Sequence, residues 1–338
     1  MDASSEMVPL VSVRKLRASL GNGAGASEVL RGVSLDIAPG EILGLVGESG
    51  SGKTMTALSM LRLLPPAIEI RAGSIDFAGR DLLALKPSEL QAVRGGKIAM
   101  IFQDPVRHLN PVFTVGQQLE AVIKAHSRQK LSRADVEARA IDLLDQVKIV
   151  NPKERLHSYP HQFSGGMAQR VMIALALAGS PDLLLADEPT SALDVTVQAE
   201  ILLLLRGIAR QRGMAILFIS HNLGAVWQLC DRVCVMYAGQ VVEDAATDVI
   251  VSRPRHPYTR ALIGALPRLD LSRSRLANIP GAMPLLNDLP GGCAFHPRCP
   301  LASTKCAVEA PALRPVGTRH LARCHYAENV LPITEAAR

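Results

Sequence analysis

The feature that most limits how this chain can fold is a glycine-rich segment, GESGSGKT, at positions 47–54. An apolar run at 42–46 precedes it, and a helical pattern at 54–64 follows it and stops before Pro65. In a strand–turn–helix unit of this kind, backbone N–H groups and a helix N-terminus converge on one point and form a phosphate site. We therefore expect a nucleoside triphosphate to bind here. The candidate residues are Gly47, Glu48, Ser49, Gly50, Ser51, Gly52, Lys53 and Thr54.

Two of these residues carry specific chemistry. Lys53 would supply a positive charge to the β- and γ-phosphates, and the Thr54 hydroxyl would bind Mg²⁺. The alternative is a glycine-rich turn with an incidental lysine. The flanking strand and helix favour the phosphate site over that alternative.

Two adjacent carboxylates follow another apolar run, at 183–186. Ligand sites in open α/β sheets lie at the carboxyl ends of the strands. We expect Asp187 to hold Mg²⁺ and Glu188 to polarise the attacking water as the general base. The pair could instead only mark the start of a helix, but its occurrence with the glycine-rich loop favours catalysis.

Apolar strand patterns alternate with helical patterns over most of the chain, which predicts an α/β fold with a largely parallel sheet. An antiparallel β unit is expected at the N-terminus, and a mostly helical subdomain at about 104–165. Proline and cysteine become frequent from about 252 onward, so we place a domain boundary between 1–251 and 252–338. Strands are expected at 11–13, 33–37, 42–46, 98–102, 183–186, 215–219 and 232–237, and helices at 54–64, 167–178 and 197–211.

Composition and apolar patterning indicate a globular protein of the cytosol. The chain has 338 residues, of which 48% are hydrophobic. Its apolar stretches are far shorter than the roughly 20 residues that cross a bilayer. The opening MDASSEMVPL lacks the basic and apolar regions of a secretory signal. Any membrane association is therefore expected to come through partners.

The positive charge is concentrated in the C-terminal region. Between positions 252 and 325, 11 Lys/Arg oppose three Asp/Glu, a net charge of +8, whereas the whole chain carries +6. Such a region can meet anionic lipid, nucleic acid, an acidic protein face or a negatively charged metal cluster. It can equally be a solvated surface, since no aromatic residues are interleaved for base stacking.

The six cysteines fall into two groups. Cys230 and Cys234 lie in an apolar segment and are expected to be small core residues. Disulfides are not expected in the cytosol, and four thiolates suit Zn²⁺ or an iron–sulfur cluster. Free thiols in a docking tail are the remaining alternative. The four cysteines of the C-terminal region, with five, six and seventeen residues between them, are Cys293, Cys299, Cys306 and Cys324.

Further short motifs follow the glycine-rich loop in a fixed order, and together they resemble the nucleotide-binding subunits of ABC transporters. The resemblance covers roughly the first 250 residues. It implies a P-loop NTPase fold with an antiparallel β subdomain and a helical subdomain. It also implies a dimer in which each ATP lies between the P-loop of one chain and the SGG motif of the other. The motif residues are Gln103 in MIFQDP, Ser164, Gly165 and Gly166 in FSGGM, Asp194 in SALD and His221 in ISHNL.

The resemblance assigns a role to each motif. Gln103 would reach Mg²⁺ and the attacking water and sense the membrane partner. The SGG motif would cap the γ-phosphate held by the other subunit, because a serine hydroxyl and N–H groups at a helix start form an anion site. Asp194 would close its loop across the dimer, and His221 would contact the γ-phosphate.

Longer stretches, including YPHQFSGGMAQRVMIALALA and RHPYTRAL, resemble the ATPase subunits of oligopeptide/dipeptide importers. This implies ATP and Mg²⁺, a second ABC ATPase subunit in a heterodimer, two transmembrane permease subunits and an extracytoplasmic solute-binding protein. The location implied is the cytoplasmic face of the inner membrane. The solute could be a peptide, nickel, an opine or an oligosaccharide. A soluble ABC ATPase acting on nucleic acid or the ribosome is the alternative, although neither two fused cassettes nor a long coiled-coil insertion is present.

Two details refine the resemblance. Segment 293–300 matches the CxFxxRCP pattern of the importer C-terminal extension, and some family members carry a [4Fe–4S] cluster there. Arg298, Lys305 and Arg323 could offset the negative charge of such a cluster. Leu20 stands where the family usually stacks an aromatic side chain on adenine, so we expect apolar contact without stacking.

Overall fold

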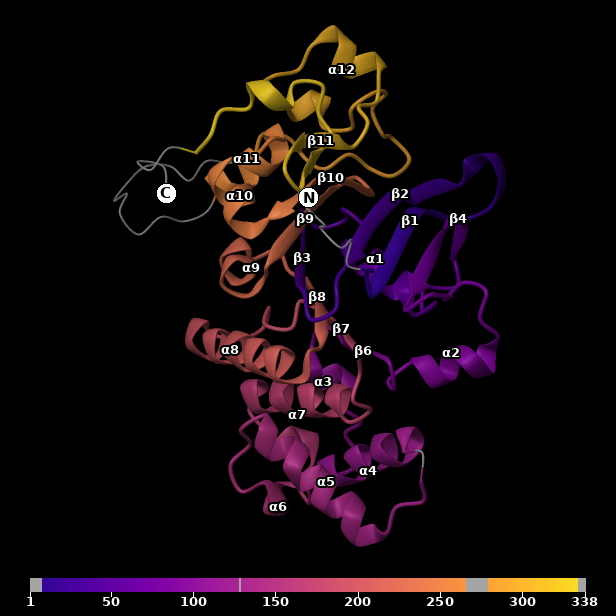
Figure 1. The fold of residues 1–338 in the computed structure, drawn as a ribbon, viewed down its shortest axis with the longest axis vertical. Coiled ribbons are helices and arrows are strands. Elements are labelled where there is room, and N and C mark those ends of the chain that lie inside the picture. The colour runs from indigo at the N-terminus through magenta and orange to yellow at the C-terminus, as the bar shows by residue number, and fades with distance from the viewer. Residues whose placement is uncertain (1–7, 128, 266–278, 334–338) are drawn as a thin grey trace, which may run out of the picture. The chain divides into compact units, whose positions relative to one another are not determined.

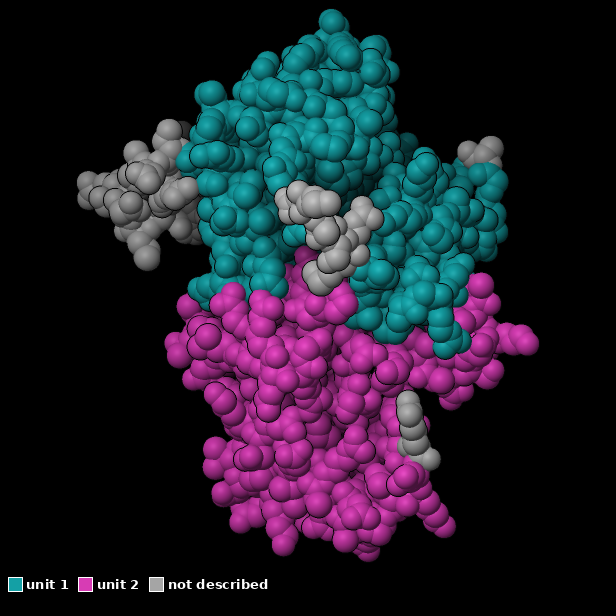
Figure 2. Space-filling model, in the orientation of Figure 1, with its two compact units in different colours: residues 1–37, 43–83, 220–338 teal, residues 38–42, 84–219 magenta. Residues whose placement is uncertain are grey.

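The computed structural model describes residues 8–127, 129–265 and 279–333. The chain divides into two compact units, coloured separately in Figure 2. Unit 1 consists of residues 1–37, 43–83 and 220–338, and unit 2 consists of residues 38–42 and 84–219.

Unit 1 contains an antiparallel sheet in the order β2-β1-β4-β5. The pairing of β1 with β2 places Val11 opposite Ile37. Val11, Val13 and Leu16 of β1 are fully buried, as expected for a strand with one face on a core. This sheet confirms the antiparallel unit predicted at the N-terminus. Its strands are β1 (Val11–Leu20), β2 (Ser27–Ile37), β4 (Ile68–Phe77) and β5 (Arg80–Asp81).

A second group of strands in unit 1 has the order β11-β12-β10-β9-β3. β3 and β9 are parallel, and β9 continues through a hairpin into the antiparallel β10. The C-terminal segment adds β12 to the edge of β10 and β11 to β12. This segment is therefore part of the same sheet as β3, although its sequence showed no strand pattern. The strands are β3 (Ile42–Val46), β9 (Arg232–Tyr237), β10 (Gln240–Ala246), β11 (Arg314–Gly317) and β12 (His320–Ala322).

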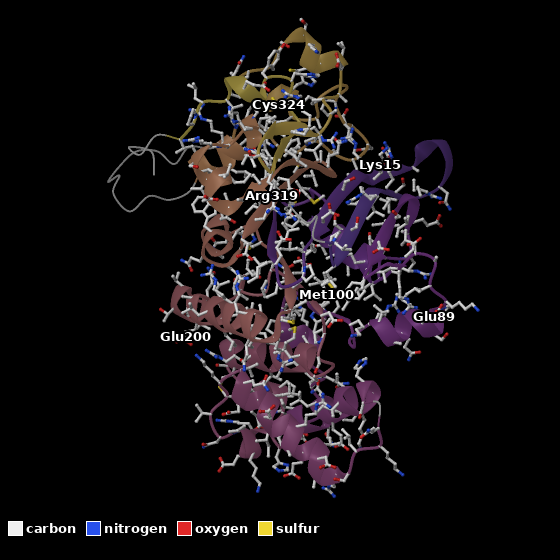
Figure 3. All side chains as sticks on the ribbon, in the orientation of Figure 1. Lys15, Glu89, Met100, Glu200, Arg319 and Cys324 are labelled. Atoms are coloured by element: carbon white, nitrogen blue, oxygen red, sulfur yellow. The ribbon has the colours of Figure 1, made fainter. Side chains whose placement is uncertain are left out.

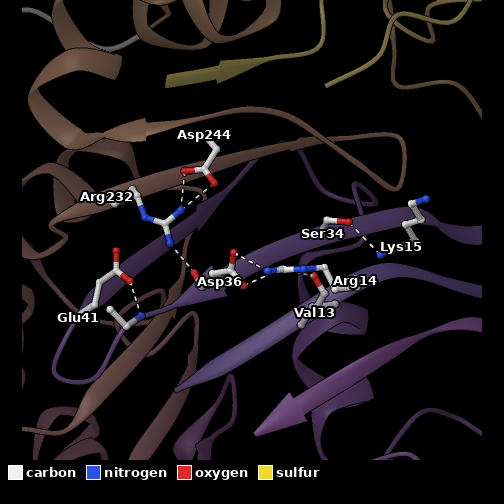
Figure 4. A network of polar contacts seen from close by, with 9 residues as sticks. Val13, Arg14, Lys15, Ser34, Asp36, Glu41, Arg232 and Asp244 are labelled. Carbon is white, nitrogen blue, oxygen red and sulfur yellow. Dashed lines mark hydrogen bonds and ion pairs between the residues drawn. The ribbon is translucent and has the colours of Figure 1, made fainter. Parts of the chain in front are cut away.

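A polar network in unit 1 ties β9 to the strands around it (Figure 4). The Arg232 guanidinium donates to both carboxylate oxygens of Asp244 at 2.7 Å and to the backbone oxygen of Asp36. The Asp36 carboxylate in turn accepts from Arg14 at 3.0 Å. Both bonds to Asp244 come from one guanidinium nitrogen and are charge-assisted, so this ion pair holds β9 against β10.

The first helix of unit 1, α1 (Lys53–Met60), is shorter than predicted. We expected it to run to residue 64 and to be stopped by Pro65. It ends instead in a Schellman motif. Arg62 has a left-handed φ of 50°, and the N–H of Leu63 donates to the oxygen of Leu58 at 2.9 Å. The other helices of unit 1 are α9 (Leu223–Leu229), α10 (Thr247–Ser252), α11 (Pro257–Gly264) and α12 (Thr304–Val308).

Unit 2 contains three parallel strands in the order β8-β7-β6. Every residue of β7 and β8 is buried, as is typical of parallel strands covered on both faces. The strands are β6 (Ile98–Ile101), β7 (Leu183–Asp187) and β8 (Ala215–Ile219), which agrees with the predicted strands to within one residue.

The helices of unit 2 include a cluster in which α4, α5 and α7 contact one another (Figure 1). Thr114 and Ser132 begin α4 and α5 with side chains that accept from the N–H three residues ahead. Of these helices, α4 and α5 lie within the range of about 104–165 that was expected to be helical, and α7 begins where that range ends. The helices are α2 (Pro87–Val93), α3 (Pro105–His108), α4 (Val115–His126), α5 (Arg133–Gln146), α6 (Pro152–Arg155), α7 (Gly165–Leu177) and α8 (Val195–Arg212).

None of the helices in the described part of the chain combines the length and the hydropathy that a bilayer crossing requires.

Candidate functional site

The glycine-rich loop lies in unit 1, between β3 and α1, where the sequence placed it. Gly47 is essential to its path, because a Cβ at this position would lie 2.2 Å from the backbone oxygen of Met236 in β9. Lys53 is 7% exposed, and its ammonium donates to the oxygens of Gly47 and Glu48, each at 2.9 Å. The lysine therefore lies folded over the loop, with its charge at the loop's centre.

Glu48 connects this loop to distant parts of unit 1. Its N–H donates to the Tyr258 hydroxyl at 2.8 Å, and its carboxylate pairs with Arg298 at 3.0 Å. Burial raises the pKa of Tyr258, so this phenol keeps its proton while its oxygen accepts the bond. Neither Tyr258 nor Arg298 was predicted to be near the loop. The motifs that contain them, RHPYTRAL and CxFxxRCP, were the only sequence signals.

His221 is also in unit 1, directly after β8 and exposed. Ser220 before it is buried, and Asn222 after it caps α9 by accepting from Gly224 and Ala225. The strand end and the helix start therefore fix the backbone on both sides of His221.

In unit 2 the carboxyl end of β7 brings Glu188 and Gln103 together. The Gln103 amide nitrogen donates to a carboxylate oxygen of Glu188 at 3.0 Å. Glu188 has a left-handed φ of 46°, and its N–H donates to the oxygen of Ile219 in β8 at 2.9 Å. Asp187, one residue earlier, is 5% exposed. The Gln103 amide oxygen and the Asp187 carboxylate are hard oxygen donors of the kind that suits Mg²⁺.

The SGG motif and Asp194 lie at the starts of two neighbouring helices of unit 2. Ser164 is the N-cap of α7 and accepts from the N–H of Met167 at 3.4 Å. A Cβ on Gly166 would lie 2.7 Å from a methyl group of Val197 in α8, so the helices approach closely there. Ser164 and Gly165 are exposed, which leaves the start of α7 accessible to another molecule. Asp194 is also exposed and caps α8.

The four C-terminal cysteines line one small cavity in unit 1, together with Phe295 and Tyr326. Its volume is about 10 Å³, roughly the space of one water molecule. Figure 3 labels one of the four, Cys324, within the C-terminal segment. In the part of the chain that the structure describes, no three His, Cys, Asp or Glu side chains are grouped as ligands of one metal ion.

Two of the cysteines of this cavity, Cys306 and Cys324, are buried, and Cys293 and Cys299 are half-buried. Burial raises the pKa of Cys299 to about 11 and that of Cys324 to about 12, and it also raises the pKa of Cys293. Two of the cations expected to offset a cluster charge have acidic partners, since Arg298 pairs with Glu48 and Lys305 with Glu309. Arg323 donates to the backbone oxygens of Val241 and Pro311. Cys230 and Cys234 are buried core residues, as predicted.

Comparisons with known proteins agree with the sequence motifs and with the fold. Residues 30–191 match the family described as ABC transporter, and residues 242–306 match the oligopeptide/dipeptide transporter C-terminal region. A probable peptide ABC transporter ATP-binding protein of Sinorhizobium fredii is 46% identical over 324 residues, covering 95% of this chain and 96% of the relative. The dipeptide transport ATP-binding protein of Escherichia coli K12 is 44% identical and covers 97% of this chain and 98% of the relative.

Solved structures show the same fold. The dimeric bacterial ABC transporter cassette MJ0796 is 26% identical, with a TM-score of 0.63, and covers 70% of this chain and 98% of that one. CbiO1 of Clostridium perfringens is 25% identical, with a TM-score of 0.61, and covers 72% and 90%. The predicted ABC ATPase fold is therefore confirmed.

The fold and the loop define an ATPase of the P-loop class that uses ATP with Mg²⁺. The chain belongs to the ABC transporter ATP-binding proteins, in the oligopeptide/dipeptide transporter family.

Proposed function

We propose that this chain is the ATP-hydrolysing subunit of a peptide importer and couples ATP binding and hydrolysis to solute uptake. One observation carries the proposal: identity of 44–46% with peptide import ATP-binding proteins extends over 95–97% of the chain. That span includes the C-terminal region as well as the ATPase motifs. The alternative, a soluble ABC ATPase acting on nucleic acid or the ribosome, is not favoured by these relatives.

The chemistry at the site follows from the residues that the motifs provide. Backbone N–H groups of the loop and Lys53 bind the phosphates of ATP. Glu188, oriented by Gln103, accepts a proton from the water that attacks the γ-phosphorus, and ADP leaves with the electrons of the broken P–O bond. His221 contacts the γ-phosphate. Thr54, Gln103 and Asp187 would hold Mg²⁺, which would neutralise charge on the β- and γ-phosphates.

Two such chains, or this chain and a second ABC ATPase subunit, would enclose two ATP molecules. The exposed start of α7 supports this arrangement, because Ser164 and Gly165 are accessible to a phosphate held by a partner. ATP would bind the closed dimer more tightly than the open one, so its binding energy would drive closure. We propose a heterodimer at the cytoplasmic face of the inner membrane, with residues 1–251 as the ATPase domain.

A groove beside α4 is the proposed docking surface for the permease subunits. It has a volume of about 590 Å³ and is lined by Phe113, Ala121, Leu175 and several polar residues. Phe113, in the lining, is 48% exposed, and Val112, which precedes it in the chain, is 71% exposed. Large apolar side chains at the rim of a groove suit a protein partner. Motion of this surface would transmit closure of the ATPase dimer to two permease subunits. An extracytoplasmic solute-binding protein would deliver the solute to these permease subunits.

We also propose that the four C-terminal cysteines hold an iron–sulfur cluster, with zinc as the alternative. The support is that all four thiols line one cavity, since four thiolates are the donor set of both. A cluster would have to move the thiols apart, because the cavity has room for about one water. Purification without oxygen, followed by metal analysis and a visible absorbance spectrum, tests this proposal. A colourless protein without iron would rule out the cluster.

The transport function is tested by co-expressing the chain with the genes beside its own and purifying the membrane complex. We expect permease subunits to co-purify. In liposomes, we expect a peptide-loaded binding protein to stimulate ATP hydrolysis. Co-purification with nucleic acid or ribosomes in place of membrane proteins would overturn the proposal.

A further inference from the structure

Arg298 of the C-terminal segment reaches into the phosphate-binding loop. Its guanidinium donates to a Glu48 carboxylate oxygen at 3.0 Å and to the Tyr237 hydroxyl at 3.3 Å. It also donates to the backbone oxygen of Pro280 at 2.8 Å. The Arg298 side chain is 7% exposed and that of Glu48 26%. A buried cation with three hydrogen-bond partners is held in one position. The side chains of a surface ion pair, in contrast, remain mobile.

An aromatic cluster holds Arg298 in place. The Phe295 ring lies 5.3 Å from the rings of Tyr237 and Tyr258, and all three side chains are at most 1% exposed. The guanidinium carbon lies 5.8 Å from the centroid of Tyr237 and 5.9 Å from that of Phe295. These distances are within the range of cation–π attraction. Tyr258 belongs to the same cluster and accepts from the N–H of Glu48, so the cluster contacts the loop at two points.

The backbone of Arg298 lies in a turn that is flanked by two of the four cysteines. Arg298 ends a short turn, His296–Arg298, that lies between Cys293 and Cys299. The N–H of Cys299 donates to the oxygen of His296 at 3.2 Å, and the N–H of Cys293 donates to the oxygen of Cys306 at 2.8 Å. The segment that carries the four thiols therefore also determines where the guanidinium lies.

The negative charge of Glu48 gives the ion pair with Arg298 its importance for the phosphate-binding loop. Glu48 places a carboxylate in a loop that has to accept a triphosphate, and like charges repel strongly where water is excluded. One Glu48 oxygen is buried with no hydrogen-bond partner among the described residues. Loss of Arg298 would leave the other oxygen without its cation as well. The carboxylate would then repel the phosphates or turn toward solvent, pulling on the loop backbone.

We propose that Arg298 is a positioning residue of the phosphate-binding loop, which makes the cysteine-bearing segment a working part of the ATP site. The inference rests on the proposed function, because it takes the loop to bind MgATP. Arg298 acts through Glu48, by neutralising its charge and fixing the loop path, and it does not itself contact the nucleotide.

The test is a double-mutant cycle on MgATP affinity, measured with a fluorescent ATP analogue on the purified full-length chain. We expect Arg298→Gln to weaken binding about tenfold, the effect of losing one charge-assisted hydrogen bond. The same substitution made in a Glu48→Gln background should have an effect of about twofold or less, because the charge that Arg298 neutralises is then absent. A general structural role would give equal losses in both backgrounds.

Arg314→Gln is the matched control, since Arg314 pairs with Glu328 at 2.8 Å in the same segment and away from the loop. It should bind MgATP like the wild type. If Arg298→Gln does not fold, Arg298→Lys keeps the charge and should retain most of the affinity. Unchanged affinity in Arg298→Gln, or equal losses in the two backgrounds, would overturn the inference. Absence of MgATP binding by the wild-type chain would instead overturn the proposed function.

Discussion

Glu188 is the residue on which the proposed hydrolysis depends most. Its backbone is left-handed directly after β7, and the Gln103 amide donates to one of its carboxylate oxygens. Such a backbone is uncommon for a non-glycine residue and is a feature of functional sites. The sequence identified Glu188 from its place after an apolar strand. The backbone conformation and the contact with Gln103 had no local sequence signal, since the two residues are 85 positions apart.

We predict that Glu188→Gln retains ATP binding and loses hydrolysis by at least about 100-fold, the usual contribution of a general base. The amide has nearly the same shape as the carboxylate but cannot accept the proton from water. Affinity for a fluorescent ATP analogue and phosphate release should be measured on the same preparation. Hydrolysis at the wild-type rate would show that another group acts as the base.

His256 gives a prediction about pH. Burial, with a smaller contribution from Arg323, lowers its pKa to about 3, and its neutral ring caps α11 by accepting from Tyr258. Above pH 6.5 this histidine is neutral in both the folded and the unfolded chain. Between pH 6.5 and 3 only the unfolded chain takes up the proton, so stability falls as the pH falls, by up to about 1.4 kcal/mol per pH unit.

The measurement is the urea concentration at half unfolding between pH 7 and pH 5. His256→Asn is the comparison, because asparagine keeps an acceptor at the cap and does not titrate. We expect the variant to show a smaller loss of stability over this range. Equal pH dependence in the two proteins would show that His256 is not the titrating group.

At the scale of elements, the buried parallel strands were the most predictable. β3, β7 and β8 consist entirely of buried residues, so their continuous apolar runs identify them without other information. β4 was missed because its first half is largely exposed and the alternation of its apolar residues is interrupted at Gly73 and Ser74. β11 and β12 were missed because each has at most four residues and is formed by pairing with β10 and with each other. Pairing of that kind leaves no periodic pattern.

The start of α8 allows a quantitative prediction. The Asp194 carboxylate accepts from the N–H groups of Thr196 at 3.1 Å and Val197 at 3.0 Å. We predict that Asp194→Ala lowers the free energy of unfolding by about 1 kcal/mol, the usual effect of losing an N-cap. Asp194→Asn should lose much less, because its amide oxygen can still accept. Urea unfolding measures both, and equal stability of wild type and Asp194→Ala would contradict the assignment of the cap.

At the scale of the whole molecule, the sequence predicted the class of protein better than the contacts between its parts. Six motifs in order identified the ATPase because each is a local pattern. The bonds from Glu48 to Tyr258 and Arg298 join residues 210 and 250 positions apart, and no local pattern encodes them. Likewise, the spacing of the four cysteines did not show that they meet. The fold brings them to one cavity by placing Cys293 beside Cys306.

Nucleotide binding should be measurable as stability of the whole chain. A ligand at about 100 times its Kd stabilises the folded state by about 2.7 kcal/mol, which raises the melting temperature by several degrees. We predict this rise for the wild type with MgATP and a much smaller rise for Lys53→Ala at the same concentration, because the charge over the loop is lost. Lys97→Ala is the matched control, since Lys97 pairs with Asp182 at 2.9 Å and belongs to none of the nucleotide motifs. It should respond like the wild type. A full response by Lys53→Ala would contradict the assignment of Lys53 to the phosphate site, since no other residue of the loop carries a positive charge.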